Sequence, residues 1–400
     1  MLRVGHARTE ITPGPHLSLI GYDFRQSQLA AGNAGVLDPL QASVLALHDG
    51  SAPALLFSLD LCILETPLAD RLRSVLARRT GVARDRILLL CSHTHSGPFP
   101  QLAQTAPSRV AVLRTQPRDP ARKANAAYAR VLEALLVDAA RCALGLLVPS
   151  GVAWAEAPVG IGYNRRVRTP DGIRLCWNPS EFPELRPAPS PDPTCTLLGF
   201  RALKGPRTHH LFSLGVHPVV LGKTSRLISA DWPGAACRIA EDLLPGATFQ
   251  FAQGASGEVH PWIATQADPE AVQTVGRAAG AALALLAQAL HPAEASGPLA
   301  TRSRTVRIGS ARVEIACWNL CGLPLLALPV ELFASLALGL RTAWGGPLFL
   351  ATLANGWECY WPDRDAFDEG AYEVEAARSF GRKPGDGERL ADAALELLRS

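Results

Sequence analysis

Residues 86–100 read RILLLCSHTHSGPFP, an apolar run that leads directly into two histidines separated by one threonine. The run ILLLC has the composition of a buried strand, because none of its side chains is charged or strongly polar. Gly97 and Pro98 then turn the chain away. The sequence therefore predicts that His93 and His95 lie at the mouth of a buried strand.

Three segments of the chain share one layout of strand, helix and strand, which is a βαβ unit. In the first unit Leu68, Leu72 and Leu76 fall on one face of the helix, where they would cover a sheet. We therefore expect an α/β fold with mixed β-sheets flanked by helices. The three units cover residues 54–91, 211–253 and 323–354, and the helix of the third is expected to begin at Glu331.

The composition excludes several classes of protein. The chain has 400 residues, of which 48% are hydrophobic and 19% charged, so it can bury a large core in one large domain or two smaller ones. The net charge of +3 comes from dispersed arginines, and without a dense basic stretch we expect no nucleic-acid partner. Neither a signal-peptide pattern nor a run of about 18 apolar residues occurs, which predicts a cytoplasmic protein without a transmembrane segment.

The nine cysteines are odd in number and scattered, with no CxxC pair. This pattern indicates neither a disulfide framework nor a zinc knuckle. Most of them are expected to be small apolar residues of the core. The sequence gives no indication of the oligomeric state.

Polar residues stand just past the predicted strands, at the edge where α/β sheets bind ligands. Imidazole, carboxylate and phenol groups can bind zinc and leave one position open for water. Structural alternatives stay open: His217 as a hydrogen-bonded core histidine, Glu331 as a helix-start residue and Tyr360 as a core aromatic. The candidates are Asp60, His93, His95, His217, His260, Glu331 and Tyr360.

Three other hydrolase classes fit the sequence less well. The metallo-β-lactamase pattern fails because the HTH motif continues as Ser-Gly-Pro and not toward Asp-His. A TIM-barrel amidohydrolase would carry its HxH motif on the first strand, whereas a strand and a helix precede His93. The stretch GASGE at 254–258 lacks the closing glycine of a nucleophile elbow, which makes Ser256 a weak candidate nucleophile.

The motifs together resemble the catalytic N-terminal domain of the neutral/alkaline (non-lysosomal) ceramidases, zinc amidases that cut the N-acyl bond of ceramide. The resemblance runs from residue 4 to about residue 373 and implies a single ceramidase-like zinc hydrolase domain over residues 1–400, without that family's C-terminal β-sandwich domain. The matching stretches are VGHARTEITP, GVLDPLQASVLAL, FSLDL, SHTHSGP, GVHPVV, QGASGEVHPW, PVELF, NGWECY and AYE.

The resemblance also implies a role for each matched residue. His95 would face the substrate as a catalytic residue, and Tyr372 would polarise the scissile carbonyl or its oxyanion. Arg165 resembles a substrate-contacting arginine, although a surface hairpin arginine is an equal alternative. Asp60 is assigned to substrate binding, with the orientation of a neighbour as its alternative. The implied zinc ligands are His93, His217, Glu331 and Tyr360.

One departure from the family lies at residues 257–261, which read Gly-Glu-Val-His-Pro where ceramidases read Gly-Asp-Val-Ser-Pro with a catalytic serine. His260 is therefore a candidate general acid or base, a substrate contact or an additional metal ligand. Metal-activated water would hydrolyse the amide without a serine. We expect a small-molecule or lipid-like N-acyl substrate, smaller or more polar than ceramide. The alternatives are ceramide itself, an ester or lactone, a sugar or nucleoside, and a non-catalytic metal-binding or ligand-sensing role.

Overall fold

The structure is a computed structural model that describes residues 1–22, 32–102, 120–292 and 297–400. An eight-stranded sheet forms its centre, in the order β13-β11-β10-β6-β1-β3-β4-β5. The pairs β4–β5 and β11–β13 are parallel and the other pairs antiparallel, so the sheet is mixed, as predicted. Its strands are β1 (Arg3–Glu10), β3 (Gln41–His48), β4 (Pro53–Leu59), β5 (Ile87–Cys91), β6 (Val148–Pro158), β10 (Thr194–Ala202), β11 (Thr208–Leu214) and β13 (Ala247–Gln253).

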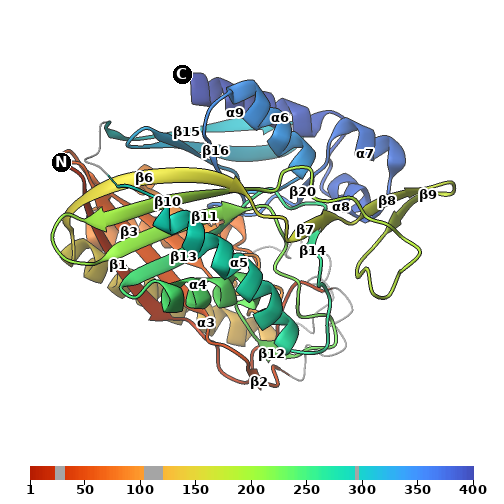
Figure 1. Cartoon of the computed structure of the whole chain (residues 1–400), viewed down its shortest axis with the longest axis horizontal. Helices are drawn as coiled ribbons and strands as arrows, with labels where there is room; N and C mark the ends of the chain where they lie inside the picture. The colour runs from red at the N-terminus through yellow and green to blue at the C-terminus, as the bar shows by residue number, and fades with distance from the viewer. Residues whose placement is uncertain (23–31, 103–119, 293–296) are drawn as a thin grey trace.

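A second, four-stranded sheet packs on one face of the first, and helices cover the outer faces of both (Figure 1). Its strands are β15 (Leu299–Ile308), β16 (Ala311–Leu320), β17 (Leu323–Ala327) and β19 (Phe349–Ala351). Helices α6 (Ala334–Trp344) and α9 (Asp386–Arg399) lie over this smaller sheet. The larger sheet is covered by α1 (Thr66–Thr80), α3 (Pro120–Gly145), α4 (Asp231–Leu243) and α5 (Glu270–Gln288).

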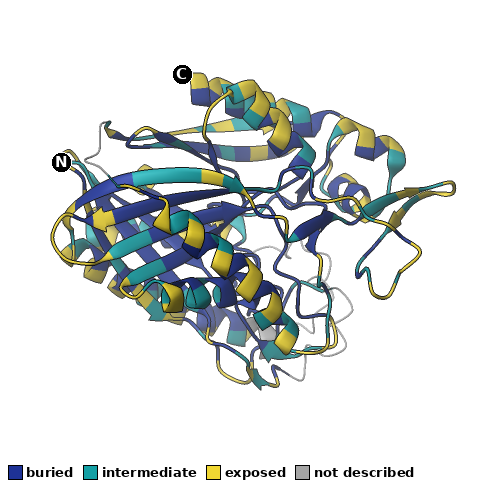
Figure 2. Ribbon diagram, viewed as in Figure 1, coloured by how far each residue is buried: buried dark blue, intermediate teal, exposed yellow. Residues whose placement is uncertain are grey.

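Strand β4 shows why the apolar runs are continuous. Leu55 and Phe57 point into the core shared with the helices α1 and α3, whereas Ala54 and Leu56 point into the core between the two sheets. A strand that is buried on both faces is mostly apolar on both and does not alternate, and the one polar side chain of β4, Ser58, donates to the Phe251 carbonyl. Figure 2 shows the result, with buried sheets between helices whose outer faces are exposed.

All three predicted βαβ units form with parallel strands, but the third differs in detail. Glu331 does not begin the helix, because it lies in the short strand β18 (Glu331–Leu332), which pairs with β20 (Tyr360–Trp361). Phe333 is still extended, with φ −68° and ψ 142°, and α6 begins only at Ala334. The expected start of this helix at Glu331 is therefore wrong.

Short elements close the end of the molecule at which the strands β5, β11 and β13 finish. The hairpin predicted near 167–177 is confirmed as β8 and β9. No helix in the described ranges is long and apolar enough to cross a membrane. These short elements are β2 (Gly35–Val36), β7 (Gly162–Asn164), β8 (Arg166–Thr169), β9 (Gly172–Leu175), β12 (Leu227–Ile228), β14 (Val259–Pro261), α7 (Arg364–Glu369) and α8 (Tyr372–Ser379), whereas the 3₁₀ helix η2 (Arg84–Arg86) lies at the start of β5.

Candidate metal centre and its cavities

His93, His217 and Glu331 follow three different strands and meet in the interior of the protein. Their potential ligand atoms all lie within 4.8 Å of one another, and all three residues are buried. Nε2 of His93 is 3.3 Å from Oε2 of Glu331, and Nε2 of His217 is 3.5 Å from the same oxygen. Three of the residues expected at the site thus form one compact cluster.

Backbone carbonyls orient both imidazoles of this cluster. Nδ1 of His93 is 2.9 Å from the carbonyl oxygen of Cys62, and Nδ1 of His217 is 3.1 Å from that of Val259. A ring nitrogen that faces a carbonyl oxygen carries a proton, because the carbonyl can only accept a hydrogen bond. The other nitrogen of each ring, Nε2, faces Glu331. Burial lowers the pKa of His217 to about 4, which keeps its ring neutral at pH 7. This arrangement is typical of histidines that bind a metal ion through Nε2.

The carboxylate of Glu331 is oriented in the same way. Its Oε1 accepts a hydrogen bond of 2.8 Å from Nε1–H of Trp357. Within the described part of the chain, neither Oε2 of Glu331 nor Nε2 of His217 has a hydrogen-bond partner. Oε2 of Glu331 thus faces Nε2 of both histidines at 3.3 and 3.5 Å without a hydrogen bond of ordinary geometry to either, an arrangement that fits a cation with nitrogen and oxygen ligands.

The charges of the cluster support the same conclusion. Burial would raise the pKa of Glu331, but His93 and His217 hold it well below its ordinary value, so the carboxylate is ionised. Burial would lower the pKa of His93, but Cys62 and Glu331 raise it well above its ordinary value. A proton and a metal ion compete for the same Nε2 lone pair of His93, so metal binding would release this proton.

Tyr360 lies beside Glu331 because the two residues are partners in the β18–β20 ladder. Burial, followed by Glu331 and Tyr372, raises the pKa of Tyr360 well above 10, while the positive charge of Arg165 acts against this rise. The centroid of the Tyr360 ring is 5.7 Å from that of Tyr372. The two tyrosines expected from the sequence are therefore neighbours at the cluster.

The backbone is strained at two of these positions. His93 has a φ of 70° and Cys359, directly before Tyr360, has a φ of 64°. This left-handed region is uncommon for residues other than glycine, and such strain gathers at functional sites. Hydrogen bonds hold it in place, from His93 N–H to the Leu61 carbonyl and from Glu331 N–H to the Cys359 carbonyl.

His95 stands next to the cluster, with its Nε2 3.4 Å from Nε2 of His93. Its ring packs edge-on against Tyr22, at a centroid distance of 5.0 Å. Gly21 has a φ of 115°, and a Cβ atom there would lie 2.4 Å from Cγ of His95. Only a glycine leaves room for the His95 ring at this place.

Two cavities adjoin the cluster, with volumes of about 400 and 350 Å³. Arg165, Trp177 and His260 line the larger cavity, whereas His93 and Glu331 line the smaller one. Both volumes are near the lower end of the range for small-molecule sites, roughly 300 to 1,000 Å³. The residues that line both cavities are Gly21, Tyr22, His95, Tyr360 and Tyr372.

Arg165 is buried at the wall of the larger cavity and is not a surface hairpin arginine. Its Nε donates to Oε1 of Glu373 at 2.6 Å, and its NH2 nitrogen donates to the Gly257 carbonyl at 2.8 Å. Its NH1 nitrogen lies 2.7 Å from Nε2 of His260. Burial, and then the charge of Arg165, lowers the pKa of His260 well below its ordinary value, so this histidine is neutral.

Asp60 does not join the other candidates. It lines neither cavity, and its Oδ2 accepts a hydrogen bond of 2.8 Å from the backbone N–H of Gln41. Burial raises its pKa to about 7. This contact fits the alternative of orienting a neighbouring segment, and a function of Asp60 in substrate binding stays a prediction.

Several residues near the site are not candidates from the sequence, among them Gly21, Tyr22 and four residues that contact the candidates. Trp357 and Glu373 belong to the quoted stretches NGWECY and AYE, so their positions beside Tyr360 and Tyr372 were a usable signal. Trp177 ends the hairpin stretch, and nothing in its pattern indicates a site. Cys62 was treated as a core residue, yet its Sγ is 3.6 Å from Nδ1 of His93.

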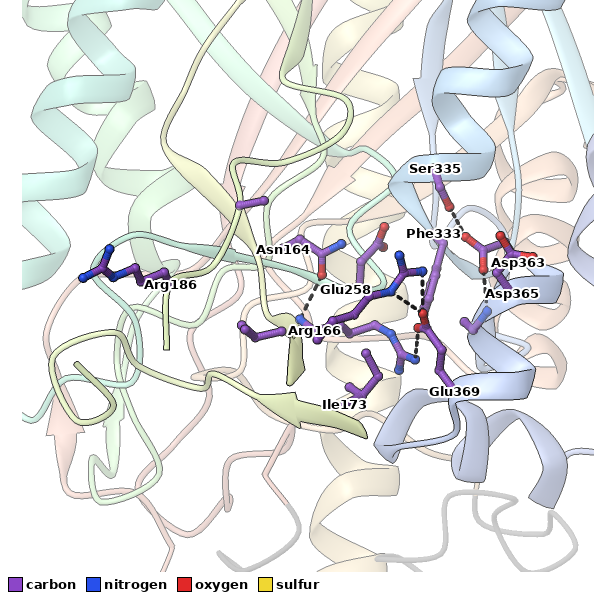
Figure 3. A pocket seen from close by; sticks show the side chains of 14 residues that line it. Asn164, Arg166, Ile173, Arg186, Glu258, Phe333, Ser335, Asp363, Asp365 and Glu369 are labelled. Carbon is purple, nitrogen blue, oxygen red and sulfur yellow. Dashed lines mark hydrogen bonds and ion pairs between the residues drawn. The ribbon is translucent and has the colours of Figure 1, made fainter. Parts of the chain in front are cut away.

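A third cavity, of about 430 Å³, is lined by Asn164 and Arg166, the sequence neighbours of Arg165, but not by Arg165 itself (Figure 3). Arg166 lines it, because successive residues of an extended chain point to opposite sides. Figure 3 shows Arg166 directed at Glu369, with 3.1 Å between NH2 and Oε2. Arg168 pairs with the same carboxylate. Since these charges pair with one another, we assign this cavity no ligand.

Solved structures of other proteins share the fold of this chain. No family model matches the sequence, and no curated protein matches it. The crystal structure of the neutral ceramidase from Pseudomonas aeruginosa is similar to this chain, with a TM-score of 0.76 and 16% sequence identity. The match covers 100% of this chain and 74% of the ceramidase chain. A structure described as ceramidase complexed with C2 has a TM-score of 0.77 and 15% sequence identity. The match covers 100% of this chain and 75% of the ceramidase chain. The resemblance seen in the sequence is thus confirmed for the architecture, and the chain has the neutral ceramidase fold.

Proposed function

We propose that this protein is a zinc-dependent hydrolase that cleaves the N-acyl (amide) bond of small compounds. The observation that carries the proposal is the buried cluster of His93, His217 and Glu331, in which Oε2 of Glu331 lies 3.3 and 3.5 Å from Nε2 of the two histidines. Tyr360, the ladder partner of Glu331, completes the proposed ligand set. Two nitrogen and two oxygen ligands suit zinc.

Zinc bound by these residues would supply a water of lowered pKa, near about 7, and a positive charge beside the substrate carbonyl. His95 is the residue we assign to proton transfer, because its Nε2 lies 3.4 Å from Nε2 of His93 at the wall of both cavities. It takes a proton from the attacking water and returns it to the leaving amine. General acid–base catalysis of this kind contributes about 100-fold to 10,000-fold to a rate.

Tyr372 is the residue we assign to the oxyanion. Its side chain is 38% exposed, lines both cavities and lies beside the Tyr360 ring. A phenol is a hydrogen-bond donor, and donors aimed at the carbonyl oxygen stabilise the tetrahedral intermediate. Removing one such donor typically costs about 2.7 to 4 kcal/mol in the barrier.

The cavities support a compact substrate. The amide bond would lie between them, beside His95 and Tyr372, with the acyl and amine portions in separate cavities of about 400 and 350 Å³. Both are lined by aromatic and charged residues. This supports a small N-acyl compound more than ceramide, while ceramide, esters and lactones stay as alternative substrates of the same chemistry.

The proposal extends to the organisation of the chain. The core between the two sheets contains residues from both, such as Leu56 and Phe349, which supports one ceramidase-like hydrolase domain over residues 1–400. The cytoplasmic location expected from the sequence belongs to the same proposal.

The test combines metal analysis with a substrate panel. Purified protein should contain one zinc per chain and hydrolyse short N-acyl amines or N-acyl amino acids faster than long-chain ceramide. His93→Ala should lose both zinc and turnover. His210→Gln, which changes a buried histidine that packs against Phe249 and lines none of the three cavities, is the matched control and should keep both. Stoichiometric zinc without turnover on any amide, ester or lactone would favour a non-catalytic metal-binding function instead.

A further inference from the structure

His260 occupies the position where the ceramidase pattern has a serine, and both nitrogens of its ring have partners. Nδ1 is 3.2 Å from the carbonyl oxygen of Trp177, and Nε2 is 2.7 Å from NH1 of Arg165. A guanidinium can only donate hydrogen bonds and a carbonyl can only accept them. The ring must therefore carry its proton on Nδ1 and accept with Nε2.

This hydrogen-bond pattern leaves His260 without a free nitrogen for a substrate or a metal ion. A general acid or base needs a nitrogen within hydrogen-bond reach of the proton that it moves. Nε2 is already bound to a permanent cation, and Nδ1 to a backbone carbonyl. We infer that His260 is a positioning residue, which acts on the reaction only by fixing Arg165 beneath Tyr360 and Tyr372.

The geometry around Arg165 shows what is fixed. Its guanidinium carbon lies 5.0 Å from the ring centroid of Trp177 and 5.9 Å from those of Tyr360 and Tyr372. Three aromatic rings thus surround one buried cation. Such contacts hold rings in place through the attraction between the cation and the π-system. The two tyrosines are those we assign to the metal and to the oxyanion.

Glu373 connects Arg165 to the helix that carries Tyr372. Its Oε1 accepts from Arg165, and its Oε2 accepts from NH1 of Arg166 at 2.9 Å. Since Glu373 directly follows Tyr372 in α8, the position of the guanidinium sets the position of the first turn of this helix. His260 is the third acceptor of the same guanidinium, after Glu373 and the Gly257 carbonyl. Loss of His260 would remove the acceptor of NH1, and the guanidinium, held then by Glu373 and the Gly257 carbonyl, would shift together with Tyr372.

The effect of His260 on catalysis rests on the proposed function. The first test is therefore a measurement of turnover. His260→Gln can keep an acceptor near the place of Nε2 but cannot transfer protons, whereas His260→Ala removes the acceptor. We expect kcat to fall by less than about 10-fold in His260→Gln and by about 100-fold in His260→Ala, the size typical of a small misplacement of catalytic groups. Zinc content should be unchanged in both variants. A loss of about 100-fold to 10,000-fold in both variants, with the pH profile losing one limb, would overturn the inference in favour of proton transfer.

A second measurement does not depend on turnover or on the fit of glutamine. In protein labelled with ¹⁵N-histidine, the His260 signals, assigned by their loss in His260→Gln, should show a protonated Nδ1 and an unprotonated Nε2. A protonated Nε2 would overturn the inference.

Thermal unfolding gives a third readout, which can be interpreted even if the proposed function is wrong. His260→Ala, Arg165→Met and the double variant should be compared, with His210→Gln as the control for a buried histidine. If His260 acts through Arg165, the double variant loses no more melting temperature than Arg165→Met alone. Additive losses would contradict the pairing. A wild-type protein that hydrolyses nothing would refute the proposed function, whereas the ¹⁵N shifts and the melting temperatures would still decide the function of His260.

Discussion

Glu331 and Tyr360 are direct register partners in the two-stranded parallel ladder of β18 and β20. Partners in neighbouring strands point to the same face of a sheet, so the carboxylate and the phenol are directed to the same side. Their neighbours Leu332 and Trp361 belong to the adjoining apolar core. Tyr360 also packs against this core, so a ladder of two residues per strand holds both proposed ligands at the edge of a hydrophobic core.

This ladder makes Glu331 the most informative residue to change. Glu331→Gln keeps the shape of the side chain and removes its charge. We expect zinc affinity to fall by more than about 100-fold, because even changes to groups that only orient a metal ligand cost about 10-fold to 100-fold. Competition with a chromogenic chelator measures this affinity. Glu396→Gln, at a side chain that is 71% exposed, is the control and should bind zinc as the wild type does.

Removal of the metal gives a related expectation for stability. The wild type should melt at a lower temperature after treatment with a strong chelator and recover on addition of zinc, because a ligand that binds only the folded state stabilises it. Glu331→Gln should show little response to either treatment. If the melting temperature of the wild type changes neither with the chelator nor with added zinc, the assignment of this cluster as a metal site is contradicted.

Trp357 is expected to act on the metal through Glu331. Its indole N–H donates to Oε1 and leaves Oε2 directed at the cluster. Trp357→Phe removes this hydrogen bond and should weaken zinc binding by about 10-fold to 100-fold. Trp344→Phe is the matched control, because its indole donates to the Pro347 carbonyl at the surface. Equal zinc affinity in the two variants would show that the Trp357 hydrogen bond does not orient the carboxylate.

Gly21 tests the position of His95 separately from the metal. In Gly21→Ala the new Cβ would lie 2.4 Å from Cγ of His95, and the φ of 115° is itself unfavourable for alanine. We expect kcat to fall by about 100-fold through displacement of His95, while zinc content stays at the wild-type level. Gly14→Ala is the control, since a Cβ there would meet no other described part of the protein within 4 Å. Loss of zinc in Gly21→Ala would instead indicate that His95 is a metal ligand.

The sequence predicted the parallel βαβ units because strands such as β4 and β5 are buried on both faces and so form unbroken apolar runs. It placed His93, His217 and Glu331 correctly at the ends of strands, since that placement follows from local order along the chain. The prediction that Glu331 begins a helix was wrong, because Glu331 lies in β18. This short strand forms only by pairing with the strand of Tyr360, which is distant in sequence. Such short non-local ladders leave no periodic pattern to read.

The burial of single polar residues could not be predicted from the sequence either. Asp60 and Arg165 both stand next to strands, but Asp60 binds the backbone of Gln41 while Arg165 lies at the wall of a cavity. What separates them is the set of partners, and Glu373 and His260 reach Arg165 only through the fold. The individual antiparallel strands of the two large sheets, such as β1 and β15, and the helix α3 (Pro120–Gly145) were likewise not predicted. Strands with one partly exposed face, such as β15, give weaker signals than fully buried ones.

Glu258 provides a prediction on stability that is independent of catalysis. Both of its carboxylate oxygens accept from the backbone N–H of Ala334, at 2.9 and 3.0 Å, at the start of α6. Burial nevertheless raises its pKa to about 8. At neutral pH the side chain is therefore protonated in the folded protein and ionised in the unfolded chain, whose carboxyl pKa is about 4.3.

The sign of the pH dependence follows from this difference. Below pH 4 both states hold the proton, and Glu258 contributes no pH dependence. Between pH 4 and pH 8, roughly, the unfolded state alone releases it, so this residue lowers the stability progressively as the pH rises. Glu258→Gln keeps the acceptor for Ala334 N–H and removes the titration. The variant should gain stability over the wild type at pH 8, on the order of a few kcal/mol, and lose this gain as the pH approaches 4. Urea unfolding at both pH values measures the difference, and a gap that is constant or that widens toward acid would contradict a raised pKa at Glu258.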